Sequence, residues 1–166
     1  MNFKLSCLAF VFLLLMTATS QAKAWRGIVP LKSTRADVER LLGLPGKYGH
    51  YEFPNETASI YYFSEAGCKD LHNCLCVSPK DIVAYIYTGV SVPMKISDLN
   101  LDMRRYKKFR SPRSPHQTTY TDDDEGITYT VAEDGEEVLL INYYESKSDC
   151  EALVKSVSQK RKAIRN

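Results

Sequence analysis

The chain has 166 residues, and its 22 basic and 20 acidic residues give a formal net charge of +2. This length fits one domain. So small an excess of basic residues excludes the strongly basic footprint that general nucleic-acid binding requires.

The first 24 residues have the three parts of a secretory signal peptide in order. Lys4 supplies the positive start, an apolar run extends from Leu5 to Met16, and Ala22 and Ala24 place small residues before a cleavage site. The apolar run is shorter than the roughly 20 residues that a membrane span needs. We therefore expect residues 1–24 to be a cleavable signal peptide, and we expect no stable membrane insertion after cleavage.

Removal of 24 residues from 166 leaves 142, and this mature part holds 20 basic and 20 acidic residues because the leader contains two lysines and no acid. A domain of that size buries about two thirds of its unfolded surface, so it folds without a metal. The sequence thus predicts a single α+β domain over residues 25–166. Its formal net charge of zero argues against a nucleic-acid partner.

The clearest predicted helix lies within residues 33–46. Thr34 can cap it with Asp37 as a short capping-box partner, and Gly43 followed by Pro45 marks its end.

Aromatic and β-branched residues predict strands at 59–63 and 82–90, with a partner strand at 48–53. Residues 94–108 suit either a short helix or a strand.

An antiparallel meander is predicted from three further strands near 117–121, 127–131 and 138–144. Its hairpin signal is Asp134-Gly135.

A closing helix is predicted after Ser148, with Glu151 three residues on as a capping-box partner. Cys150 then falls on the apolar face of this helix. The predicted fold is α+β, an antiparallel sheet of about five strands with two main helices on one face.

The mature chain has an even number of cysteines, which in an oxidising compartment predicts disulfide bonds. Pairing Cys68 with Cys150 would force a tight Cys74–Cys76 ring. We therefore expect Cys68 to pair with Cys74 or Cys76, and the remaining cysteine to pair with Cys150. Zinc binding by these cysteines with His72 is the alternative, but the spacing lacks the usual pair separated by two residues.

Two charged segments and several tyrosines are candidates for partner binding. A basic block spans residues 104–113, and an acidic turn follows at 122–125, where Gly126 comes too early for a calcium loop. Tyrosine and arginine are favoured at interfaces. The candidate partner-binding residues are Arg104, Arg105, Tyr106, Tyr143 and Tyr144. Pairing of the two charged segments within the fold, with tyrosines that only cover the sheet, is the alternative.

No nucleophile elbow, zinc-protease motif, phosphate loop or dinucleotide fingerprint occurs in the sequence. We therefore expect no catalytic residues, no metal site and no cofactor. The sequence predicts a periplasmic or extracellular binding module of the bacterial cell envelope, whose partner is a protein or another envelope component. A small secreted hydrolase, with a site assembled only in three dimensions, is the alternative.

The segment from Trp25 to Gly43, which opens WRGIVPLKSTR and continues DVERLLG, resembles a group of exported bacterial proteins of unknown activity that begin their mature chains with this string. The helix ending in Leu42-Gly43-Leu44-Pro45 more distantly resembles the SmpA/OmlA outer-membrane lipoprotein family. That second resemblance implies a shared fold. The lipidated cysteine of that family is missing here.

Overall fold

The computed structural model describes residues 21–46, 48–63, 74–112 and 114–165. Within these ranges the strands form one antiparallel sheet of order β1-β2-β3-β7-β6-β5-β4. The strands are β1 (His50–Glu52), β2 (Glu56–Tyr62), β3 (Val83–Val90), β4 (Lys107–Phe109), β5 (Gln117–Asp122), β6 (Ile127–Ala132) and β7 (Val138–Tyr143). The helices are α2 (Arg35–Leu42), α3 (Cys74–Val77) and α4 (Lys147–Arg165), with 3₁₀ turns η1 (Ile96–Leu99) and η2 (Met103–Arg105).

The predicted α+β class is confirmed, with seven strands instead of about five. The ambiguous segment 94–108 accounts for part of the difference, because it contains both 3₁₀ turns and the start of the three-residue edge strand β4. So short a strand gives little periodicity for sequence analysis to detect.

Helix α2 begins and ends where its capping residues predict. The Thr34 hydroxyl oxygen accepts from the Asp37 N–H at 3.1 Å, and Asp37 Oδ2 accepts from the Thr34 N–H at 3.0 Å. Gly43 ends the helix with a φ of +79°, a conformation that glycine adopts without steric cost. Val38, fully buried, fixes the helix to the sheet.

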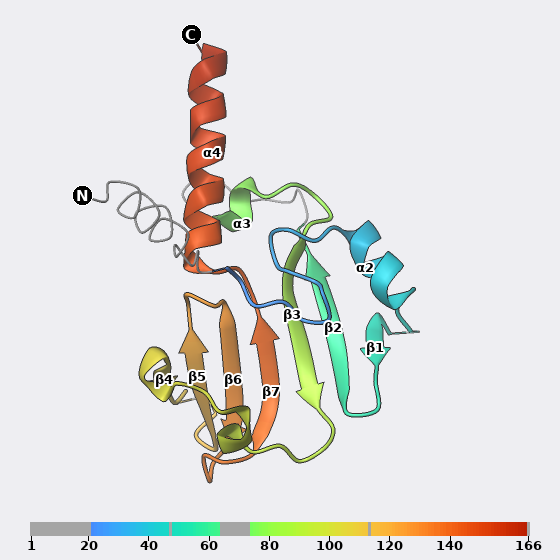
Figure 1. Ribbon diagram of the computed structural model, residues 1–166, viewed down its shortest axis with the longest axis vertical. Helices are drawn as coiled ribbons and strands as arrows, with labels where there is room; N and C mark the ends of the chain where they lie inside the picture. The colour runs from blue at the N-terminus through green and yellow to red at the C-terminus, as the bar shows by residue number, and fades with distance from the viewer. Residues whose placement is uncertain (1–20, 47, 64–73, 113, 166) are drawn as a thin grey trace, which may run out of the picture.

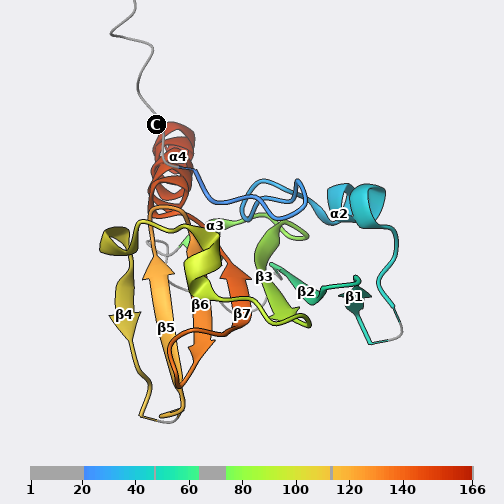
Figure 2. The same cartoon turned by 60° about the horizontal axis from the view of Figure 1, so that its bottom comes forward.

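One face of the sheet carries the core and is called the covered face here. Over β1, β2 and β3 it packs against Trp25, Ile28 and Val38. Over β5, β6 and β7 it packs against the segment that runs from Met94 to Tyr106, which crosses in front of these strands in Figure 2. These two contacts cover both halves of the same face.

Helix α4 begins two residues earlier than predicted. The Ser146 hydroxyl oxygen accepts from the Asp149 N–H at 3.1 Å and donates to Asp149 Oδ2 at 2.9 Å, so the predicted capping pair of Ser148 and Glu151 is wrong. Ser146 is fully buried in the short connection between β7 and α4, directly before the first residue of the helix. Figure 1 shows that α4 leaves the end of the sheet and projects beyond it, whereas α2 lies beside β1 and the end of β2. Among the described residues, no helix is both long and apolar enough to cross a membrane.

Candidate functional site

The face of the sheet opposite the core is called the open face here. Strand residues alternate between the two faces, so the cross-strand partners on this face can be followed from edge to edge. One line of partners crosses all seven strands of the described chain and is called the polar row: His50, Ser59, Tyr87, Asn142, Thr128, Thr121 and Lys107. The sheet thus presents a continuous line of hydrogen-bonding side chains.

Two hydrogen bonds within the polar row fix its side chains. His50 Nδ1 lies 2.6 Å from the Ser59 hydroxyl oxygen, and the hydroxyl oxygens of Thr121 and Thr128 lie 3.0 Å apart. At the centre of the row, Asn142 Oδ1 is buried without a hydrogen-bond donor among the described residues. The row therefore combines pre-oriented hydroxyl groups with one unsatisfied acceptor.

Three tyrosines of the open face lie on the neighbouring strands β2 and β3. Tyr61, Tyr85 and Tyr87 are 45%, 42% and 38% exposed. Tyr61 and Tyr85 are cross-strand partners with stacked rings whose centroids lie 4.4 Å apart. Partial burial raises the pKa of Tyr85, so its hydroxyl stays protonated at neutral pH and remains a hydrogen-bond donor.

Two cations of the basic block, Arg105 and Lys107, pair with the acidic turn within the fold. Arg105 contacts Asp122 at 2.8 Å and Glu125 at 2.7 Å, and Lys107 pairs with Asp123. The hydrogen bond that Arg105 donates to Glu125 is the main cause that raises the pKa of Arg105. Asp122 Oδ1 also accepts from backbone N–H groups inside the turn. The contact with Asp122 Oδ2 is close but lacks the alignment of a hydrogen bond.

The predicted partner-binding residues do not share one surface. Tyr106 packs on the second core cluster, 5.9 Å from the Tyr129 ring, and Tyr143 contacts both core clusters. Burial raises the pKa of Tyr106 to about 12 and raises that of Tyr143 as well. Arg104 is exposed and pairs with the adjacent Asp102.

Tyr144 is the member of this predicted set that lies beside the open face. Its hydroxyl donates to Asp123 Oδ1 at 3.3 Å and to the Asp122 carbonyl at 3.4 Å. It also lines a hollow of about 350 Å³ with Glu145, Lys147, Cys150 and other residues at the start of α4. Burial raises the pKa of Tyr144.

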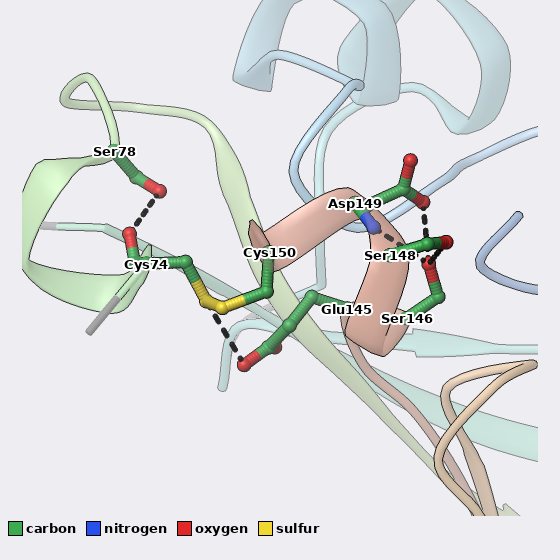
Figure 3. The surroundings of a disulfide bond; sticks show 7 residues. All are labelled: Cys74, Ser78, Glu145, Ser146, Ser148, Asp149 and Cys150. Atoms are coloured by element: carbon green, nitrogen blue, oxygen red, sulfur yellow. Dashed lines mark hydrogen bonds between the residues drawn. A yellow bond between two sulfur atoms is a disulfide. The ribbon is translucent and has the colours of Figure 1, made fainter. Parts of the chain in front are cut away.

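A disulfide bond between Cys74 and Cys150 joins α3 to α4 (Figure 3). This pairing is one of the two predicted for Cys150. Cys68 and the side chain of Cys76 lie outside the described part of the structure, as does His72. Glu145 Oε1 lies 3.6 Å from Cys74 Sγ, and burial raises the pKa of the Glu145 carboxyl.

The described residues contain no group of three or more His, Cys, Asp or Glu side chains arranged to hold a metal ion. The acidic turn instead closes the hairpin between β5 and β6. The contact between His50 and Ser59 pairs a base with a hydroxyl nucleophile, and no described hydrogen bond places a carboxylate behind the imidazole.

Sequence reasoning missed Ser59, Tyr87 and Asn142 as neighbours. Their alternation within each strand is visible in the sequence, but the register that aligns them depends on the pairing of β3 with β7. Comparison with protein-family models, curated proteins and solved structures finds no significant match.

Proposed function

We propose that this chain is an exported, non-catalytic binding module of the cell envelope that takes its partner on the open face of its sheet. The observation that carries the proposal is the exposure of Tyr61, Tyr85 and Tyr87 beside the polar row. Tyrosine combines a large apolar ring with a hydrogen-bonding tip, and it loses little conformational entropy on binding. A face of this composition supplies both the contact area and the polar specificity of an interface.

The edges of the sheet support docking on the face instead of strand addition. Strands β1 and β4 form the two edges, and each has three residues. Edge strands this short offer few unpaired backbone groups to a partner strand. A partner that binds the sheet therefore gains more from the side chains of the open face.

The charge distribution supports a partner without strong charge. The polar row has His50 at one end and Lys107 at the other, and its five central residues are uncharged. Three cations of the neighbouring basic block, Arg104, Arg105 and Lys107, are held in ion pairs. Electrostatic steering toward a polyanion is consequently weak at this face.

The test uses the tagged mature protein as bait in an envelope extract, followed by affinity measurement with the purified partner. Replacing both Tyr85 and Tyr87 with serine removes two exposed aromatic anchors. Interface anchors are worth about 2 kcal/mol each, so we expect the double variant, which loses about 4 kcal/mol, to lose roughly 1,000-fold in affinity. Tyr48→Ser is the matched control, because Tyr48 is 78% exposed and lies outside the sheet strands.

Two results would count against the proposal. One is unchanged affinity of the double variant for a reproducible partner, and the other is an equal loss with Tyr48→Ser. Circular dichroism of each variant shows whether the fold is intact.

The contact between His50 and Ser59 supports the second candidate function, a small secreted hydrolase. In that reading Ser59 is the nucleophile and His50 is its general base. A fluorophosphonate probe tests this directly. If the probe labels Ser59 and the His50→Gln substitution abolishes this labelling, the hydrolase is favoured. If Ser59 is not labelled, the binding module is favoured.

A further inference from the structure

The second half of α4 is a cationic arm that projects from an otherwise acidic molecule. The helix has 19 residues and is therefore about 28 Å long at 1.5 Å per residue. It points away from the sheet along the long axis of the molecule (Figure 1). Among the described residues, the Cys74–Cys150 disulfide and the Ser146 cap hold the beginning of the helix. The arm is thus fixed in direction at one end and exposed at the other.

Charge is divided unevenly between α4 and the rest of the chain. Residues 147–165 contain six basic and two acidic residues, whereas residues 21–146 contain 15 basic and 18 acidic residues. Both acids of α4, Asp149 and Glu151, lie in its first two turns. The cations Lys160, Arg161 and Lys162 therefore lie on a stretch of helix that contains no carboxylate.

The described cations of the arm also differ from those of the sheet in their pairing. Nine Lys and Arg side chains before α4 form ion pairs. Within the described part of the chain, none of the exposed arm cations Lys160, Arg161 and Lys162 forms such a pair. Their charge is available to an external anion.

The arm is amphipathic as well as basic. Leu153, Val157 and Ile164 share one side of α4, because their spacings of four and seven residues are whole turns. Ile164 is 84% exposed. Lys160 and Arg161 lie three and four residues after Val157, so they flank this apolar side. Apolar residues flanked by long cationic side chains are typical of helices that lie in a membrane interface.

We propose that the distal half of α4 docks the protein on a bilayer surface that contains anionic phospholipids. The phosphates would neutralise the arm cations, and the shallow apolar layer beneath them would accept Ile164. Nucleic acid would supply phosphates for the cations but no apolar layer for Ile164. The acidic remainder of the molecule is repelled by the same surface, so contact is made by the end of the arm. This inference does not depend on the open face.

The test is co-sedimentation of the full mature chain with phosphatidylcholine vesicles, with and without phosphatidylglycerol. We expect binding only to the anionic vesicles, and we expect added salt to weaken it by screening. A Lys or Arg near an anionic surface strengthens binding about fivefold, so Lys160→Gln with Arg161→Gln should lower the partition coefficient roughly 25-fold. Ile164→Ser should also lower it.

The matched control is Lys80→Gln with Arg110→Gln. These two exposed cations lie outside α4 and, like the arm cations, form no described ion pair. This control and the Tyr85/Tyr87 double variant should bind vesicles like the parent. Equal binding to neutral vesicles, no binding to anionic ones, or an equal loss in the control would overturn the proposal. So would tighter binding to a single-stranded oligonucleotide than to anionic vesicles.

Discussion

Removing the Cys74–Cys150 disulfide should cause one of the largest stability losses available in this chain. The bond joins residues separated by 76 positions, and the enclosed segment contains β3 through β7. In the chain-entropy model a closed loop of that length stabilises the folded state by about 4 kcal/mol. For a domain of this size that loss corresponds to a fall in Tm of about 10–15 °C.

The double variant Cys74→Ala with Cys150→Ala measures this effect without leaving a free thiol at either position. Urea unfolding should show a lower midpoint, and the free energy of unfolding in water should fall by about 4 kcal/mol. Ser78→Ala is the control, because it removes only the hydrogen bond from the Ser78 hydroxyl to the Cys74 carbonyl and should cost about 1 kcal/mol. A loss below about 1 kcal/mol in the double variant would refute the reasoning.

Three further predictions concern single residues and use the same urea assay. Gly126→Ala should lower the free energy of unfolding by about 3 kcal/mol or more, because φ is +62° and the new Cβ would lie 2.3 Å from the Tyr144 carbonyl oxygen. Gly135→Ala is the control: its φ is +76° but open space surrounds it, so it should cost about 1 kcal/mol. Equal losses in the two variants would contradict the steric argument. Burial raises the pKa of Glu145, so the folded state binds its proton more tightly than the unfolded chain and stability falls as pH rises from below the unfolded pKa through the folded one. Glu145→Gln should therefore raise stability at pH 7 and flatten this dependence, and an unchanged pH profile would count against it. Val38→Ala should cost about 2 kcal/mol, because the fully buried side chain fixes α2 to the sheet; a loss under 0.5 kcal/mol, on the order of a surface substitution, would contradict that role.

Local signals in the sequence were sufficient for the elements that depend on a few neighbouring residues. Thr34 and Asp37 set the start of α2, and Gly43 sets its end. The Asp134-Gly135 turn lies between β6 and β7, with Gly135 at a φ of +76°. In each case the residue that sets a helix end or a turn lies within four positions of that helix end or turn.

The open face could not be predicted, because it depends on long-range register. Pairing of Tyr87 with Asn142 joins the two halves of the sheet across more than fifty residues, and no local pattern encodes that register. The same limit applies to the neighbours Tyr143 and Tyr144. Alternation places them on opposite faces, but only the register shows that Tyr143 enters the core.

The most direct test of the central claim is chemical nitration of tyrosines in the free and partner-bound protein, read by peptide mass spectrometry. If the partner docks on the open face, Tyr85 and Tyr87 will be nitrated in the free protein and protected in the complex. Tyr48, which is exposed in the turn before β1 and is not a strand residue, will be nitrated equally in both. Unchanged nitration of Tyr85 and Tyr87 in a saturated complex would contradict the claim.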